Sequence, residues 1–94
     1  MGFEVIWTKR AETNLGNVKK FLKDNWTLKV RIEFSTKVKN IIELLTINNN
    51  LGSVINKHSD TRKILVTKHN YLYYRVKNNK LFIVNFLDTR KRKS

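Results

Sequence analysis

Few residues of this sequence can transfer a proton near neutral pH. It has two histidines, His58 and His69, and no cysteine. Ser59 and Asp60 directly follow His58, but neighbours in sequence cannot place the reactive atoms of a Ser–His–Asp triad within reach of one another. We therefore interpret His58 as part of a solvated loop and His69 as a turn residue. No thiolate site is available, and no metal-ligand spacing or glycine-rich loop predicts a metal or a cofactor.

The charge of the chain points to binding chemistry instead. Lys and Arg total 20 against 7 acidic residues, which gives a net charge of +13 at pH 7. Such an excess opposes compaction by self-repulsion, and solubility alone needs a smaller imbalance. Nucleic acid, an anionic membrane or an acidic protein would each justify it. No apolar run reaches the length of a membrane span and no signal peptide is visible, so we expect a cytoplasmic protein without a membrane partner.

Two amphipathic helices are predicted in the first half of the chain. Thr8 and Thr27 are suited to cap their N-termini. Trp7 and Trp26 are expected to pack in the core or at the joint between the helices. Apolar residues follow helical spacing in both segments, with Ala11, Leu15, Val18 and Leu22 in the first helix and Val30, Phe34, Val38, Ile41, Ile42 and Leu45 in the second. The short joint predicts an antiparallel helical hairpin.

The remaining chain has the period of β-strands. Residues 3–7, 62–67, 71–77 and 80–87 are predicted strands, and Asn78-Asn79 is a two-residue hairpin turn. The order β-α-α-β-β-β predicts an α+β fold in which the helical hairpin packs on one face of a small, mostly antiparallel sheet. We expect a single domain over residues 1–94, ending in a basic tail at about 88–94.

Strand alternation divides the side chains between the two faces of this sheet. The face under the helices is expected to hold Leu72, Tyr74 and Val76 opposite Phe82, Val84 and Phe86. The other face collects Tyr71, Tyr73 and Arg75, with Asn85 and Thr89 nearby. That face is polar, aromatic and cationic, which favours recognition, although cross-strand packing is the commoner use of alternating tyrosines.

Four motifs in this order resemble the RelE/ParE superfamily of toxins from bacterial type II toxin–antitoxin systems. The sequence VIWTKRA at 5–11 resembles the superfamily's strand-to-helix start, and RKILV at 62–66 its Arg-initiated second strand. YYRV at 73–76 matches its third strand, and FLDTR at 86–90 an aromatic-x-Asp-x-Arg ending found in one branch. The proline that usually follows this ending is missing. The resemblance spans residues 3 to 93.

This resemblance implies one of two mechanisms. One branch cleaves mRNA in the ribosome with general acid–base groups and no metal, whereas ParE-like members poison DNA gyrase. Tyr71 stands where the nucleases carry an Arg, and Thr89-Arg90 stands where a nuclease branch ends in His-Tyr. Thr and Arg cannot act as bases near neutral pH. Arg62, Arg75 and Arg90 can still bind an anion, so we predict a ParE-like toxin that inhibits growth by binding, and is not an enzyme.

The resemblance also implies partners and a role in plasmid stabilisation. An acidic antitoxin from a neighbouring gene should neutralise the toxin, with Lys29, Arg31 and Lys37 on the second helix as candidate contacts. The target would be DNA gyrase or the ribosome and its mRNA, with Arg62, Tyr71, Tyr73, Arg75 and Arg90 as candidate contacts. Operator DNA would be bound only through the antitoxin. A ribosome-dependent RNase and a degenerate toxin that only binds remain alternatives.

Overall fold

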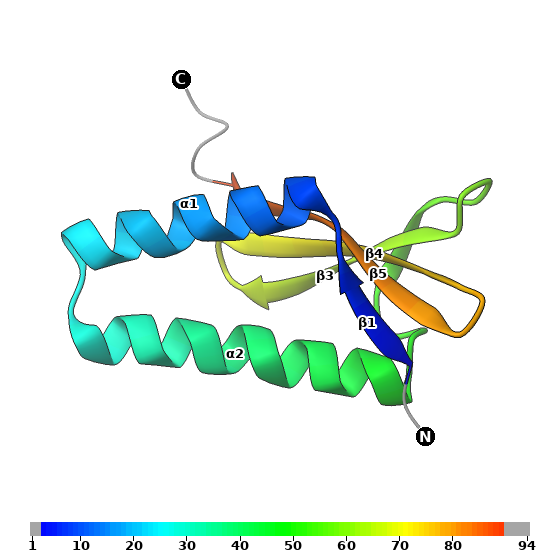
Figure 1. Ribbon diagram of the computed structural model, residues 1–94, viewed down its shortest axis with the longest axis horizontal. Helices are drawn as coiled ribbons and strands as arrows, with labels where there is room; N and C mark the ends of the chain where they lie inside the picture. The colour runs from blue at the N-terminus through cyan, green and yellow to red at the C-terminus, as the bar shows by residue number, and fades with distance from the viewer. Residues whose placement is uncertain (1–2, 90–94) are drawn as a thin grey trace.

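A computed structural model describes residues 3–89 as two helices over one five-stranded sheet. Both helices lie on the same side of that sheet (Figure 1). The strand order is β1-β5-β4-β3-β2, with β1 parallel to β5 and all other neighbours antiparallel. This arrangement confirms the predicted α+β fold. The elements are β1 (Glu4–Trp7), α1 (Lys9–Asn25), α2 (Leu28–Ile47), β2 (Ser53–Asn56), β3 (Thr61–Thr67), β4 (Asn70–Lys77) and β5 (Lys80–Asp88).

Threonine side chains begin both helices, as predicted. The Thr8 hydroxyl oxygen accepts a hydrogen bond from the Ala11 N–H at 3.2 Å, and the same hydroxyl donates to the Ile83 carbonyl at 3.0 Å. Thr27 accepts from the Val30 N–H at 3.3 Å. Each cap satisfies an N–H that has no partner within the helix. The hydrogen bond from Thr8 to Ile83 also connects the start of α1 to β5, and so positions the helical hairpin over the sheet.

The core lies between the helical hairpin and the sheet. The edge of Phe34 in α2 meets the ring of Phe86 in β5 with the ring centroids 5.9 Å apart. Burial of each large apolar side chain of this kind stabilises the fold by about 1.5–3 kcal/mol. The buried apolar residues are Ala11, Val18, Leu22, Phe34, Val38, Leu45, Val66, Leu72, Tyr74, Leu81, Ile83 and Phe86. The first six are positions that the helical spacing predicted.

A β-bulge in β5 makes the predicted face of two residues wrong. Leu72 stands opposite Phe86 and Tyr73 opposite Asn85, but Tyr74 stands opposite Ile83, so Val84 is an additional residue. An added residue shifts the alternation of everything before it. Leu81 and Ile83 are therefore buried under the helices, whereas Phe82 and Val84 are only half-buried. Simple alternation had predicted Phe82 and Val84 in the core.

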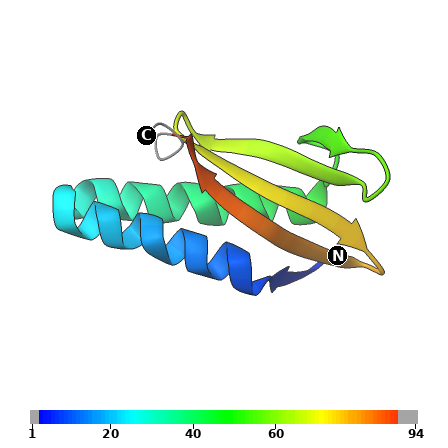
Figure 2. The ribbon, with the colours of Figure 1, turned by 90° about the horizontal axis from the view of Figure 1, so that it is seen from above.

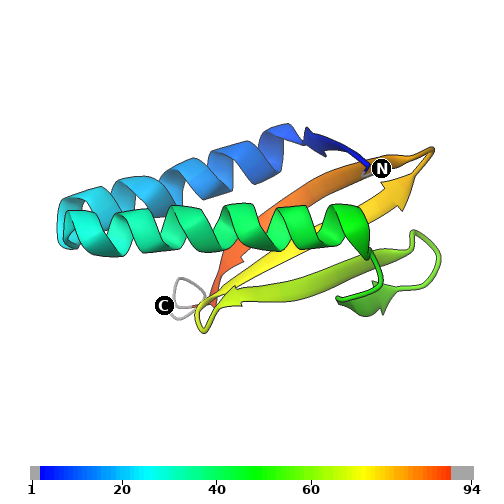
Figure 3. The same cartoon turned by 90° about the horizontal axis from the view of Figure 1, so that it is seen from below.

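The two ends of β5 also differ in how well they were predicted. The turn before it is as expected, since Asn78 and Asn79 have φ of 54° and 62°, the positive values that a two-residue hairpin turn requires. At the other end, Asp88 was expected in the basic tail but is the last residue of β5 and is buried. The Thr89 N–H then donates to the His69 carbonyl at 2.7 Å, which holds the end of β5 beside the β3–β4 turn (Figure 3).

An edge strand, β2, was not predicted from the sequence. Its two apolar residues, Val54 and Ile55, are adjacent in the sequence, so it lacks the apolar alternation by which strands are found. All four residues of the strand are exposed. It pairs with β3 at the edge of the sheet (Figure 2). The loop before it is held by Tyr74, whose hydroxyl donates to the Asn49 carbonyl and accepts from the Gly52 N–H, each at 2.8 Å. A Cβ on Gly52 would lie 2.7 Å from that hydroxyl, so only glycine fits there.

Replacing Tyr74 with phenylalanine is expected to lower the free energy of unfolding by about 1–3 kcal/mol, because the buried Gly52 N–H then loses its acceptor. Burial raises the pKa of the Tyr74 phenol, against smaller lowering effects of the Gly52 hydrogen bond and the Arg62 charge. The hydroxyl's contribution is therefore present below the ordinary tyrosine pKa of about 10 and is lost as the pH rises through the raised value. Urea unfolding measures both effects.

Tyr73→Phe, on the opposite face of the same strand, is the matched control and should change stability by less than about 0.5 kcal/mol. Equal stability of the two variants would contradict the role given to Tyr74.

Candidate functional site

The sheet face away from the helices carries a mixed aromatic, apolar and cationic surface, which we call the open face. Across the central strands, Tyr71 stands between Leu65 and Leu87, and Arg75 stands opposite Phe82. Leu65 is 46% exposed. The open face comprises Ile6, Lys63, Leu65, Tyr71, Tyr73, Arg75, Phe82 and Leu87. The structure thus brings Tyr71, Tyr73 and Arg75 together as predicted, but adds apolar neighbours that the prediction had left out.

Arg75 carries a buried, unsatisfied hydrogen-bond donor on the open face. Its Nε is buried and has no hydrogen-bond partner within residues 3–89. Its register neighbour Phe82 is apolar, and Phe82 in turn stands beside Ile6 of β1. A surface pair with Asp60 or Asp88 was the alternative explanation for this arginine, and among residues 3–89 Arg75 Nε has no hydrogen bond to either carboxylate. The side chain as a whole is only half-buried, so the exposed part of the guanidinium can contact an external anion, for which its planar fork is suited.

Lys63 and Tyr71 form a second cationic feature of the open face. The Lys63 Nζ lies 4.6 Å from the centre of the Tyr71 ring, within the range of a cation–π interaction. Tyr73 stands directly opposite Lys63 in the register. This contact holds the ring and the ammonium group in a fixed relation without neutralising the charge.

Two other predicted residues, Arg62 and Asn85, lie apart from the open face. Arg62 stands opposite the buried Tyr74, and its guanidinium donates to the Gly52 carbonyl at 2.8 Å. It therefore fastens the loop before β2. Asn85 was expected near the open face, but its side chain accepts a hydrogen bond from Asn14 of α1 at 2.6 Å, because the bulge redirects it. Arg90 lies outside the described residues.

Neither histidine belongs to the open face. His58 is exposed in the turn after β2, and His69 lies in the β3–β4 turn. The eight residues of the open face include no His and no carboxylate; by strand parity Glu4 shares this side of the sheet at its edge, opposite Lys80 in the register. The central part of the open face is therefore suited to bind anions and apolar groups. Across residues 3–89 no cluster of three or more His, Cys, Asp or Glu could hold a metal ion.

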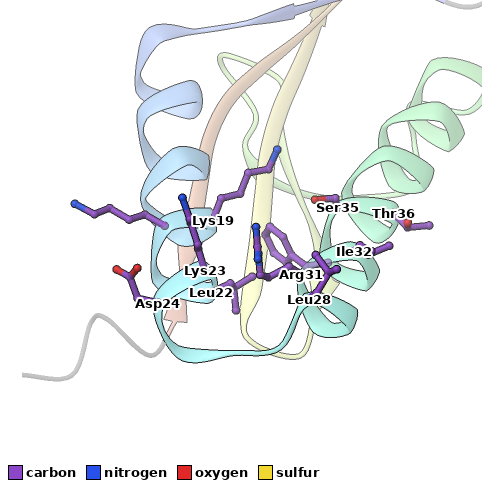
Figure 4. Close-up of a pocket in the computed structure, with 11 residues that line it drawn as sticks. Lys19, Leu22, Lys23, Asp24, Leu28, Arg31, Ile32, Ser35 and Thr36 are labelled. Carbon is purple, nitrogen blue, oxygen red and sulfur yellow. The ribbon is translucent and has the colours of Figure 1, made fainter.

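A groove between α1 and α2, which we call the helical groove, was not predicted. It consists of two cavities of about 650 and 300 Å³ that share Lys19 and Ser35. Leu22 and Arg31 point into the space between the helices (Figure 4). The apolar lining comes from Trp7, Leu15, Leu22, Leu28, Ile32, Phe34, Val38 and Ile42, and the charged lining from Lys19, Lys20, Lys23, Asp24, Arg31, Lys39 and Glu43.

The three cations proposed as antitoxin contacts do not share one surface. Arg31 lines the helical groove, Lys37 lines a different cavity, and Lys29 is exposed away from both. A usable signal for the groove was present in the sequence. Leu28 and Ile32 are four residues apart and fall outside the apolar core stripe of α2, and they are 62% and 56% exposed.

Comparison with known proteins finds a matching family and similar structures. Residues 5–93 match the model of a family described as the ParE toxin of type II toxin-antitoxin system, parDE. A structure of the chromosomal ParDE TA system from P. aeruginosa is similar, with a TM-score of 0.73, 14% identity and coverage of 92% of this chain and 95% of that one.

A mutant of YafQ from E. coli is similar too, with a TM-score of 0.59, 16% identity and coverage of 98% and 99%. No curated protein matches in sequence. Within the described residues, neither helix has the length and apolar character needed to cross a membrane. Because the family match covers nearly the whole chain, the chain belongs to the ParE toxin family of type II toxin–antitoxin systems.

Proposed function

We propose that this toxin arrests growth by binding an essential target through its open face, and that the target is DNA gyrase, as the resemblance to ParE-like toxins implies. The observation that carries this proposal is Arg75, a half-buried cation whose Nε has no partner in the described structure. It stands among tyrosines and apolar residues that are enriched at the centres of protein interfaces. A target carboxylate or phosphate would supply the partner that the arginine lacks.

The composition of the open face argues against RNA cleavage. A ribonuclease of this superfamily needs groups that accept and donate protons, each contributing about 10²–10⁴-fold to the rate. Tyr71 and Thr89 stand where the resemblance assigns nuclease residues, and His58 and His69 lie in turns. The lysine and arginine side chains of the open face bind charge without relaying protons.

The purified toxin is therefore expected to leave mRNA intact on programmed ribosomes and to inhibit DNA supercoiling by purified gyrase. Primer extension across the mRNA and a plasmid supercoiling assay measure the two outcomes with one protein preparation. Arg75→Ala should restore supercoiling and serves as the control for protein-specific inhibition. Site-specific cleavage in the ribosomal A site, with supercoiling unaffected, would instead establish the ribosome-dependent RNase.

The antitoxin is proposed to bind the helical groove through an acidic amphipathic segment. The groove extends along α2 from Leu28 to Glu43, roughly 22 Å at 1.5 Å per residue. Such a length suits about four turns of a helix laid into an apolar groove. The larger cavity of the groove is lined by four cationic side chains and one acidic side chain, Asp24; the cations are Lys19, Lys20, Lys23 and Arg31. Opposite charge raises both the specificity and the association rate of such a partner.

A further inference from the structure

A third cavity lies between the joint of the two helices and the β3–β4 turn, and we call it the joint pocket. Its volume is about 340 Å³, within the range of ligand sites. Trp26 lies at the joint between the helices, one of the two places expected for it, and is 50% exposed where it lines this pocket. The walls are formed by Val18, Leu22, Trp26, Val30 and Phe34 on the apolar side, and by Glu33, Lys37, Thr67, Lys68, His69 and Asn70 on the polar side.

A buried amide group in the joint pocket lacks a partner. Asn70 is 3% exposed, and its Oδ1 accepts a hydrogen bond from the Thr67 hydroxyl at 2.6 Å. The Thr67 oxygen is in turn the acceptor for the His69 N–H at 3.1 Å. The other amide atom, Asn70 Nδ2, has no hydrogen-bond partner in the described part of the chain. Buried donors in folded proteins are almost always satisfied, so this N–H is a donor that a water or a ligand carbonyl at the pocket can satisfy.

The charges around the joint pocket select the kind of ligand. Lys37 comes from α2 and Lys68 from the β3–β4 turn, so cations stand on two walls. Glu33 is the single acid among the lining residues, and the buried Asp88 stands opposite Asn70 in the register. The chain as a whole carries +13. An anionic ligand with an apolar portion is therefore complementary to the pocket, and a carbonyl oxygen of that ligand can accept a hydrogen bond from the buried donor.

We propose that the joint pocket anchors one large apolar side chain of an acidic protein segment, whose backbone carbonyl accepts a hydrogen bond from Asn70 Nδ2. The volume exceeds that of one aromatic side chain and leaves room for the adjoining backbone. The joint pocket and the helical groove share Leu22 and Phe34, so a single segment can occupy both. That this segment belongs to the antitoxin rests on the proposed function, whereas the chemistry of the pocket does not.

Two synthetic peptides with blocked ends test the pocket directly: Glu-Glu-Phe-Glu-Glu and its counterpart with Ser in place of Phe. In NMR titrations of the intact chain, the Phe peptide should shift the Asn70 side-chain amide and the Trp26 indole signals. The Ser peptide should bind at least tenfold more weakly, since burial of the aromatic side chain is lost. Equal affinity of the two peptides, or shifts that spare Asn70 and Trp26, would overturn the proposal.

Variants locate the binding on the protein. Val30→Phe fills the pocket and should weaken binding of the Phe peptide at least tenfold. Leu44→Phe, on the same helix but outside the described cavities, should leave binding of that peptide unchanged. Lys68→Glu, in an exposed turn, should weaken both peptides, and Lys57→Glu in the other exposed turn is its control. Unchanged binding by Val30→Phe and Lys68→Glu would refute the site. Growth arrest is not a readout here, so failure of the proposed function would leave this result standing.

Discussion

Arg75→Ala is expected to abolish growth inhibition while the protein still folds and still binds its antitoxin. Arg75 is half-buried on the open face, and no described residue accepts a hydrogen bond from its Nε. Its removal therefore costs the fold little and removes the anion-binding group from the proposed target interface. Truncation of an interface arginine at a hot spot costs about 2 kcal/mol or more, which weakens target binding by about 30-fold.

Growth after induction, with and without the antitoxin, measures this effect, and circular dichroism confirms folding. Arg10→Ala removes the same charge from an exposed position of α1 and should remain fully toxic. Arg75→Lys should also weaken toxicity, because an ammonium group cannot replace the bidentate fork. Full toxicity of Arg75→Ala would move the site elsewhere, first to the basic residues of α2 around Lys29 and Lys37.

The parts of the fold that depend on local sequence could be predicted. Thr8 and Thr27 cap the helices because a hydroxyl beside a free N–H is sufficient, wherever the helix later packs. Asn78 and Asn79 form the hairpin turn because asparagine tolerates the positive φ. The core faces of α1 and α2 follow from a spacing of three to four residues. Each of these features is decided within a few residues of chain.

Features that depend on distant contacts could not be predicted. The bulge at Val84 arises where β5 must pair with β4 while Asn85 reaches Asn14 of α1. Nothing in the alternation of β5 itself reveals an additional residue. Similarly, β2 forms because Tyr74 and Arg62 hold the loop before it from within the sheet. Long-range pairing determines both the bulge and β2, and the residue pattern along the chain carries no information about that pairing.

The candidate site was predicted in part for the same reason. Tyr71, Tyr73 and Arg75 alternate on one strand, so their shared face follows from the strand period. Phe82 joined them only through the shift in register that the bulge introduces. The helical groove depends on how far α1 and α2 are apart around Ser35, which no spacing within either helix determines.

Ser35→Trp is expected to weaken antitoxin binding by about 100-fold or more and to leave growth inhibition intact. Ser35 is the small, exposed residue shared by the two cavities of the helical groove. An indole at this point fills the groove where a bound helix would have to pass, so the segment loses its apolar contacts on both sides. A loss of this size corresponds to about 2.7 kcal/mol of binding free energy, and it should appear as toxicity that the antitoxin no longer relieves.

The binding partner for this measurement is the acidic protein encoded by the reading frame adjacent to the toxin gene. It should co-purify with the unaltered toxin and relieve its toxicity, and failure of both would show that the pairing itself is wrong. Asn40→Trp introduces the same side chain at an exposed position of α2 that lines none of the three cavities, and should bind like the unaltered chain. If Ser35→Trp bound the antitoxin normally, the antitoxin would have to dock outside the groove. The exposed edge of β2 would then be the next surface to test, because an unpaired strand edge accepts an added strand.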